Sequence, residues 1–204
     1  MNVYFINLSD QIKKTAPPQR RKALSNLLVK KLLAKEMDMP EQKIQFARTS
    51  FGKPYLINNM RHFNVSFSNE TFMMVTNNTP VGADIEYIKE INDIDDVISN
   101  FAPEEQKALS GLQYTEKIEY FYRLWVLKES YIKAIGKGFS CPLNSFYIAD
   151  KPPDCSLIYS AEKDLNWIFK SYSLPEGYKS AVCARTGAFF KKPITLYVND
   201  LLNA

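Results

Sequence analysis

The chain has 204 residues, of which 46% are hydrophobic and 24% charged, a balance typical of a globular protein and not of a disordered chain. No apolar run reaches the roughly 18 residues that would indicate a membrane span. Charge is unevenly spread, since residues 1–60 carry 11 basic and 4 acidic side chains (+7) and residues 61–120 carry 4 basic and 11 acidic ones (−7).

The first part of the chain predicts a strand, a long helix and four short strands. The apolar run at 3–8 predicts the first strand. A helix is expected to begin near Pro17-Pro18, because proline is tolerated in a first turn, and to run to about Asp38. Its predicted apolar stripe is Leu24, Leu27, Leu28 and Leu32. Gly, Asn and Pro turn signals separate further strands near 43–48, 63–67, 71–77 and 80–87.

The second part repeats this order loosely. Residues 92–112 predict one or two short helices, with a start at Pro103, which two acids follow. Residues 115–136 predict a long helix that the glycines of AIGKGFS end, and strands are expected at 144–149, 155–160, 166–174, 178–185 and 194–198. The pattern predicts an α+β fold of two similar, packed (pseudo-dimeric) halves, 1–100 and 101–204, each a long helix against a small, mostly antiparallel sheet.

Cysteine and histidine are scarce. Cys141, Cys155 and Cys183 are odd in number and widely spaced, no CxxC pair occurs, and His62 is the single histidine. This argues against a zinc site or a disulfide framework and favours buried free thiols in a reducing compartment. The N-terminus has no basic region before its apolar run, so we expect no secretion signal and a cytoplasmic protein.

Two acids follow the apolar start of VGADIEYIK, residues 81–89. Asp84 and Glu86 are two positions apart, so in a strand both carboxylates leave the same face. With Glu129 they offer three carboxylates, the ligand type that Mg²⁺ prefers, whereas imidazole and thiolate ligands for softer metals are lacking. On spacing alone, solvated acids at a strand end are an equal alternative.

A further acid interrupts the apolar face of the long helix. At 3.6 residues per turn, Glu129 lines up with Tyr122, Trp125 and Ile132. An isolated carboxylate among apolar groups is costly, so it should be paired, protonated or bound to a metal. Lys133 follows one turn later, and a Glu129–Lys133 ion pair is the simplest interpretation of KESYIK. That pair does not explain why it interrupts the apolar stripe.

Basic and small polar side chains suggest an anion site. In RTSFGKPYL, residues 48–56, Arg48 and Lys53 flank a glycine turn whose N–H groups would suit a phosphate. The alternative is an ordinary charged hairpin turn. FNVSFS adds small hydrogen-bonding groups at Asn64, Ser66 and Ser68. With the charge gradient, this favours a site that binds an anion and a cation, although two solvated surfaces of opposite sign explain the charge counts more simply.

Four motifs in order, GKPY, FNVSFS, VGADIE and W-x-x-KES-x-x-K, resemble the 4'-phosphopantetheinyl transferases of the Sfp type over residues 20–185. The resemblance implies Mg²⁺-dependent transfer of the 4'-phosphopantetheine arm of coenzyme A to a serine hydroxyl of an apo acyl or peptidyl carrier protein, with release of adenosine 3',5'-bisphosphate. We expect a monomer with no nucleic-acid or membrane partner. The alternatives are a non-catalytic nucleotide- or nucleic-acid-binding module, against which the acidic middle third argues, and a carrier-binding subunit without catalysis.

The resemblance also implies roles for residues. It assigns Mg²⁺ to Asp84, Glu86 and Glu129, and catalysis to Glu129 as base and Lys133 at the coenzyme A diphosphate. Coenzyme A would further contact Arg48, Gly52, Lys53, Pro54, Asn64, Val65 and Ser66. Phe67 stands where the family usually has a histidine that contacts coenzyme A. The connecting segment 88–112 is the expected docking surface for the carrier protein, through an isoleucine exposed within 88–98.

Overall fold

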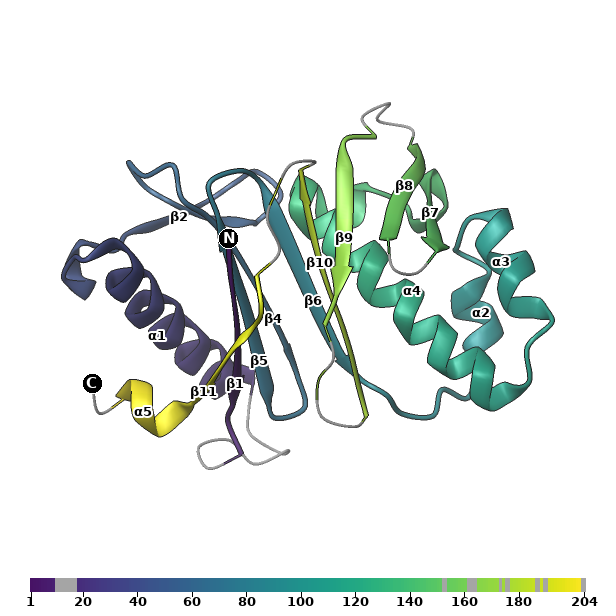
Figure 1. The fold of residues 1–204 in the computed structure, drawn as a ribbon, viewed down its shortest axis with the longest axis horizontal. Coiled ribbons are helices and arrows are strands. Elements are labelled where there is room, and N and C mark those ends of the chain that lie inside the picture. The colour runs from purple at the N-terminus through teal and green to yellow at the C-terminus, as the bar shows by residue number, and fades with distance from the viewer. Residues whose placement is uncertain are drawn as a thin grey trace.

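The computed structural model describes residues 1–9, 18–151, 154–160, 165–172, 174, 177–185, 188 and 191–202. Two halves lie side by side, each a long helix on a sheet, with helix α1 (Pro18–Met37) in one half and helix α4 (Tyr114–Ile135) in the other (Figure 1). The predicted α+β fold is confirmed. Both helices were predicted within a residue or two of these bounds, except that Pro17 lies outside the described residues.

The first sheet has the strand order β11-β1-β5-β4, with β1 (Asn2–Asn7), β4 (His62–Ser68), β5 (Thr71–Asn77) and β11 (Ile194–Tyr197). Only β1 and β11 are parallel in it. Helix α1 covers one face, where Leu28 and Leu32 pack into the core and Leu24 is partly buried. The predicted stripe was wrong at Leu27, which is 38% exposed because it lies at the solvent edge of the helix.

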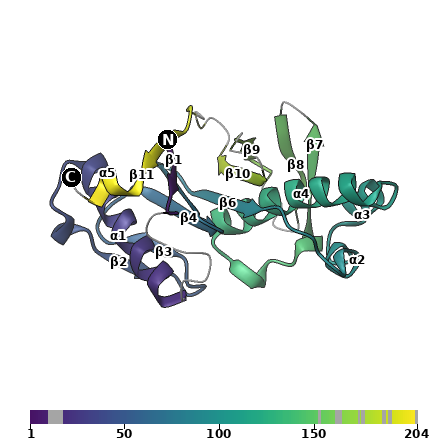
Figure 2. The same cartoon turned by 90° about the horizontal axis from the view of Figure 1, so that it is seen from below.

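The second sheet is wholly antiparallel and has the order β6-β10-β9-β8-β7. Its strands are β6 (Val81–Tyr87), β7 (Phe146–Lys151), β8 (Asp154–Ser160), β9 (Trp167–Ser171) and β10 (Tyr178–Arg185). Helix α4 packs on it through buried Leu127 and Tyr131, which meet Phe146 and Phe169. Figure 2 shows the two sheets and their helices from below.

The two sheets share an apolar core. Val3, Phe5 and Val75 of the first sheet pack with Ile85 and Val182 of the second. The two sheets do not divide at the predicted boundary, residue 100. Strand β6 comes before this residue but belongs to the second sheet, and β11 comes after it but belongs to the first. The halves therefore pack directly on each other, and each sheet takes one strand from the other part of the chain.

The remaining elements are short. A hairpin of β2 (Phe46–Arg48) and β3 (Pro54–Leu56) precedes β4, and α2 (Ile94–Ile98), α3 (Pro103–Ser110) and α5 (Val198–Leu202) complete the fold. The strand predicted at 43–48 begins later, because Glu41–Lys43 forms a 3₁₀ turn, and the sequence did not predict α5. Cys141 and Cys183 are buried free thiols, as predicted, whereas the side chain of Cys155 lies outside the described residues.

The isoleucines of 88–98 pack inward. Ile94 and Ile98 are buried, and Ile88, Ile91 and Val97 are partly buried against the same apolar cluster of α3 and α4. The expectation of an exposed isoleucine in this segment was wrong, since α2 needs these side chains to dock on α4. Among the described residues, no helix is both long and apolar enough to cross a membrane.

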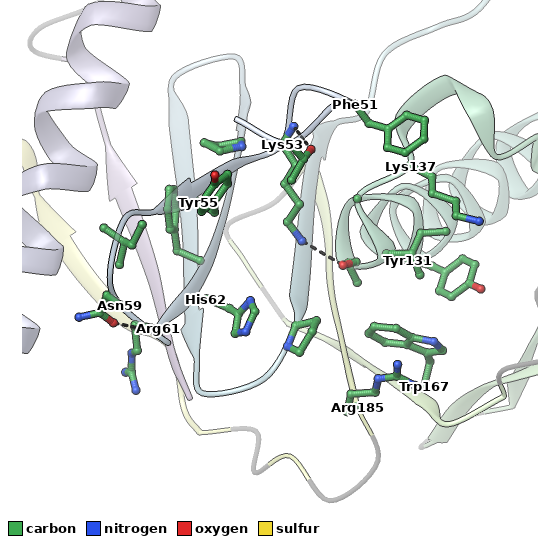
Figure 3. Close-up of a pocket in the computed structure, with 18 residues that line it drawn as sticks. Phe51, Lys53, Tyr55, Asn59, Arg61, His62, Tyr131, Lys137, Trp167 and Arg185 are labelled. Carbon is green, nitrogen blue, oxygen red and sulfur yellow. Dashed lines mark hydrogen bonds between the residues drawn. The ribbon is translucent and has the colours of Figure 1, made fainter. Parts of the chain in front are cut away.

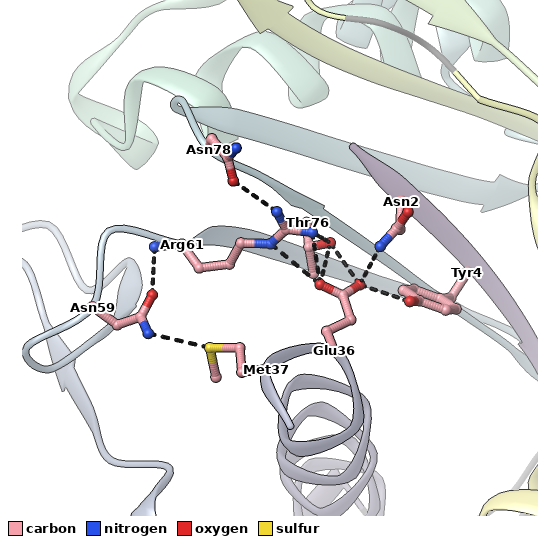
Figure 4. Close-up of polar contacts among 8 residues, drawn as sticks. All are labelled: Asn2, Tyr4, Glu36, Met37, Asn59, Arg61, Thr76 and Asn78. Atoms are coloured by element: carbon pink, nitrogen blue, oxygen red, sulfur yellow. Dashed lines mark hydrogen bonds and ion pairs between the residues drawn. The ribbon is translucent and has the colours of Figure 1, made fainter. Parts of the chain in front are cut away.

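A buried carboxylate fastens the end of α1 to the first sheet (Figure 4). Glu36, whose side chain is 8% exposed, accepts hydrogen bonds from Tyr4 Oη at 2.6 Å, Asn2 Nδ2 at 2.9 Å and Thr76 Oγ1 at 2.8 Å, and it pairs with Arg61 at 2.8 Å. Burial alone would raise the pKa of Glu36, but the hydrogen bonds from Tyr4, Asn2 and Thr76 and the charge of Arg61 together lower it.

Candidate active site

The candidate site forms where α4 crosses β6, and a glycine sets the distance between them. A Cβ on Gly82 would lie 2.0 Å from the backbone oxygen of Ser130 and 2.3 Å from the backbone nitrogen of Ala134. The helix backbone therefore rests directly on the strand, which only glycine permits here. This contact brings the turn of α4 that carries Glu129 and Lys133 next to the strand that carries the two acids.

Lys133 joins the helix to the strand. Its Nζ donates to Asp84 Oδ1 at 2.5 Å and to Ser66 Oγ at 3.1 Å, and Ser66 Oγ donates to Asp84 Oδ1 at 2.8 Å. The Asp84 side chain is 3% exposed, so water screens this ion pair weakly. Among the described residues no ion pair involves Glu129, so the simplest sequence interpretation, a Glu129–Lys133 pair, was wrong.

Polar side chains, not a backbone ladder, join β4 to β6. The backbone N–H of Ala83 donates to Asn64 Oδ1 at 2.9 Å. Ser68 Oγ donates to Glu86 Oε2 at 2.8 Å and accepts from the backbone N–H of Tyr87 at 2.9 Å. Ser66 makes the equivalent contact to Asp84. Ser68 was named with Asn64 and Ser66 as a small hydrogen-bonding group but was not predicted to contact coenzyme A, and its contact with Glu86 was not predicted.

The carboxylates act on one another. Burial raises the pKa of Glu86, and the charge of Asp84 raises it further. Burial also raises the pKa of Glu129; Lys133 opposes this shift, while Asp84 and Glu86 add to it. The three predicted metal ligands are therefore close enough to repel one another, and a cation among them would relieve that repulsion.

A direct test of the metal hypothesis is the surroundings of Asp84. Its Oδ2 is buried and has no hydrogen-bond partner, which is rare for a carboxylate oxygen. Among the described residues, however, no three His, Cys, Asp or Glu side chains are gathered as a metal cluster, and the Lys133 ammonium lies on Asp84 Oδ1. The type of donor and the partnerless Asp84 Oδ2 fit Mg²⁺, whereas the three carboxylates are not gathered around one point, and the cation beside Asp84 in this structure is the Lys133 ammonium.

A cavity of about 560 Å³ opens beside these residues. One wall comes from α4, where Trp125, Glu129 and Ile132 of the predicted face line the cavity together with Lys133, whereas Tyr122 of that face does not. The other walls come from loops, from the start of β3 and from β4: Phe51, Gly52, Lys53, Pro54, Asn64, Val65, Asn100, Gly136, Gly138, Cys141, Pro142, Leu143 and Asn144. Ser66 and Asp84 adjoin this cavity through Lys133.

The two cations of the hairpin hold its turn in place. Arg48 Nη1 donates to the carbonyl oxygen of Gly52 at 2.7 Å. Lys53 Nζ donates to the carbonyl oxygens of Val81 at 3.1 Å and Ala134 at 2.9 Å, and burial lowers its pKa to about 8. The segment is the charged hairpin of the alternative interpretation, and Lys53 pins it to β6 and to the last turn of α4. Contact of either cation with coenzyme A stays a prediction.

Phe67 lies on the other face of β4 from Ser66 and Ser68. It packs at the edge of the first core, and the guanidinium of Arg21 lies 5.1 Å from its ring centroid. This is the geometry of a cation–π contact. An arginine from the first turn of α1 thus stands beside the position where a histidine was expected.

A buried ion pair that the sequence did not predict fixes α4 next to the candidate site. Lys128, the neighbour of Glu129, is fully buried and donates to both carboxylate oxygens of Glu105, at 2.9 and 2.6 Å, and to the carbonyl oxygen of Phe146 at 3.0 Å. Glu105 also accepts the backbone N–H groups of Ala102 and Ile148. The pair fastens α3 and β7 to α4. Nothing local in the sequence indicates which acid Lys128 meets.

Comparisons with known proteins agree with these motifs. A family described as the 4'-phosphopantetheinyl transferase superfamily matches residues 80–183, and one described as 4'-phosphopantetheinyl transferase, N-terminal, matches residues 12–79. The 4'-phosphopantetheinyl transferase gsp of Aneurinibacillus migulanus is 38% identical over 98% of this chain and 81% of its own length.

The chain is also similar to a second relative and to a solved structure. The 4'-phosphopantetheinyl transferase Sfp of Bacillus subtilis (strain 168) is 32% identical over 80% of this chain and 73% of its own length. A holo-(acyl-carrier-protein) synthase from Bacillus anthracis str. Ames, solved in complex with CoA, aligns with a TM-score of 0.43 at 19% identity and covers 54% of this chain and 97% of that chain.

Proposed function

This chain belongs to the 4'-phosphopantetheinyl transferase superfamily, and we propose that it transfers the 4'-phosphopantetheine arm of coenzyme A to a serine hydroxyl of an apo acyl or peptidyl carrier protein. The assignment of this activity to particular residues rests on the Ser66–Asp84–Lys133 cluster at the edge of the cavity. In this cluster the buried Asp84 Oδ2 has no hydrogen-bond partner. The cluster supplies a cation for a diphosphate and an oxygen for a metal ion in one place.

Asp84, Glu86 and Glu129 are the residues that would hold Mg²⁺. Their support is the orphan oxygen of Asp84 and the raised pKa values of the two glutamates, which burial and neighbouring carboxylates produce. Bound Mg²⁺ would neutralise negative charge on the diphosphate and on the leaving group.

The side chains of the cluster divide the chemistry. The serine oxygen of the carrier protein forms a bond to the phosphorus next to the pantetheine arm, and the bond from that phosphorus to the leaving oxygen of adenosine 3',5'-bisphosphate breaks. Glu129 is the group proposed to accept the serine proton, and the raised pKa that burial gives it in the metal-free protein is in keeping with a base. Lys133 donates to the diphosphate oxygens on which negative charge develops. Much of the rate enhancement comes from holding the two reactants in line.

Coenzyme A would occupy the cavity between α4 and the hairpin. Gly52, Lys53, Pro54, Asn64 and Val65 line it and are the residues proposed to contact coenzyme A there, with Arg48 and Ser66 adjoining. The other candidate, a non-catalytic nucleotide- or nucleic-acid-binding module, is not favoured, because the relatives are transferases. A monomeric state and a cytoplasmic location stay predictions.

The test is a transfer assay. The protein is incubated with coenzyme A, MgCl₂ and each of several apo carrier proteins, and the products are weighed by mass spectrometry. We expect a gain of one phosphopantetheine on at least one carrier protein. Asp84→Ala and Glu129→Ala should abolish this gain while the circular dichroism spectrum stays unchanged. Glu86→Ala should reduce it less, since water can replace one Mg²⁺ ligand.

Glu116→Ala is the matched control, because Glu116 is an exposed glutamate in the first turn of the same helix. This variant should keep the full rate. Excess chelator should stop the wild type, and added MgCl₂ should restore it. Full transfer in metal-free buffer, or by Asp84→Ala, would refute the metal assignment, and no transfer to any carrier protein would refute the activity itself.

A further inference from the structure

A second, larger cavity has a volume of about 880 Å³, and Figure 3 shows the residues that line it. The active-site contacts use Ser66 and Ser68 of β4, whereas this cavity uses His62 and Phe63 at the start of that strand and Pro80 just before β6. Its other walls come from the hairpin, the last turn of α4, the start of β9 and the end of β10. The proposed transfer chemistry uses neither this cavity nor His62.

Basic side chains border the cavity. Lys53, Arg61, His62, Lys137 and Arg185 line it, and none of its described lining residues is acidic. Arg61 is paired with Glu36, and the lowered pKa of His62 leaves this imidazole uncharged at neutral pH, so Lys137 and Arg185 are the cations considered for an anion. Burial lowers the pKa of His62, and the nearby charge of Lys53 lowers it further, as expected where basic groups gather. A concave surface lined by basic groups of one sign concentrates anions.

Aromatic rings lie among these basic groups. The Arg185 guanidinium lies 4.3 Å over the ring of Trp167, and Tyr131 meets that ring edge-on at 5.8 Å. Trp167 is 3% exposed and Tyr131 0%, so these rings hold the guanidinium in place and offer little open surface themselves. Across the cavity, Phe51 and Tyr55 of the hairpin are 53% and 47% exposed and also line it. Stacked guanidinium and aromatic surfaces suit a planar heterocycle. The volume falls within the range of small-molecule sites.

We propose that this cavity is a second ligand site, separate from that of coenzyme A, and that it binds a nucleotide: a planar base with an attached phosphate group. The base would lie against the exposed rings of Phe51 and Tyr55 and the stacked guanidinium of Arg185, and the phosphates would face Lys137 and the edge of that guanidinium. Phe51, Lys53, Pro54 and Gly136 line both cavities, so the two sites share one wall.

The two tryptophans make the sites separately measurable. The chain has 2 tryptophans, and Trp125 lines the first cavity while Trp167 lines the second. In the variant Trp125→Phe, only Trp167 fluoresces. We titrate this variant with ADP, adenosine and pyrophosphate in the presence of saturating coenzyme A. ADP should change the Trp167 emission saturably, and loss of either the base or the phosphates should weaken binding at least about tenfold.

Charge variants test the residues. In the same background, Lys137→Gln with Arg185→Gln should weaken ADP binding at least about tenfold, whereas Lys107→Gln, an exposed lysine of α3, should not change it. Adenosine or pyrophosphate binding as tightly as ADP would overturn the proposed ligand class. Loss of the ADP signal as coenzyme A saturates would mean that the two ligands share one site, and would overturn the proposal.

If Trp125→Phe does not fold, calorimetry decides the question on the wild type. ADP should still bind when coenzyme A is saturating, and the double charge variant should lose that heat. No binding of ADP at millimolar concentration in either experiment overturns the proposal. These readouts are binding measurements, so they are independent of whether the transferase assay succeeds.

Discussion

Gly82→Ala should disable the active site without touching any of its polar groups. The added Cβ would lie 2.0 Å from the Ser130 oxygen, whereas ordinary contact begins near 3.4 Å, so the two backbones must separate by about 3.4 − 2.0 = 1.4 Å. The three nearest obstructing atoms, from Ser130 and Ala134, all belong to the backbone of α4, so no side-chain rotation relieves the clash. Overpacking of this kind costs about 1–3 kcal/mol, or roughly 2–4 °C of Tm for each kcal/mol in a chain of this size.

The same movement separates Lys133 from Asp84. A misplacement of about 1 Å at a reacting centre lowers rates about 100-fold. We therefore expect the rate of phosphopantetheine transfer to fall by about that factor, even at temperatures where the variant is fully folded. The Tm is measured by circular dichroism, and the rate is measured by mass spectrometry at saturating coenzyme A and carrier protein.

Gly111→Ala is the matched control, since a Cβ there meets nothing within 4 Å and the residue has an ordinary negative φ of −89°. It should leave both Tm and rate unchanged. If Gly82→Ala behaves like Gly111→Ala in both measurements, the close approach of α4 and β6 does not set the geometry of the site, and the reasoning fails.

Three further substitutions test other parts of the structure. Lys128→Met leaves Glu105 buried without its cation and should cost about 3–5 kcal/mol in urea unfolding; a loss below 1 kcal/mol would contradict a buried pair. Glu36 has a pKa below its usual 4.5 in the folded state, so its stabilisation is present above pH 4.5 and is lost as pH falls through the lowered value. Glu36→Gln should flatten the unfolding free energy between pH 5 and pH 3 (about the range in which a carboxylate of ordinary pKa titrates), and an unchanged slope would count against this. Burial raises the pKa of Glu129 in the metal-free protein and Lys133 opposes the shift, so Lys133→Gln should raise this pKa further, as measured by NMR titration of the carboxyl group without Mg²⁺. An unchanged pKa in this variant would contradict the electrostatic contact between the two side chains.

The local sequence determined the elements of this protein and several of the site residues. Helix α4 was expected at 115–136 and runs from Tyr114 to Ile135, ending at Gly136, whose φ of 73° suits glycine. Asp84 and Glu86 were expected on one face of a strand, and each accepts a hydrogen bond from a serine of β4. These features depend on backbone propensity and side-chain period, which a few neighbouring residues fix.

Only the tertiary structure decided which partners meet. Lys133 prefers Asp84, 49 positions away, to Glu129 one turn before it, and Lys128 meets Glu105 across 23 positions. The sequence likewise did not predict that β6 belongs to the second sheet and β11 to the first. Each outcome depends on how apolar faces from distant segments are buried together, and on a glycine that lets two backbones touch. A contact between segments is chosen by the packing of the whole core, so no local pattern of residues encodes it.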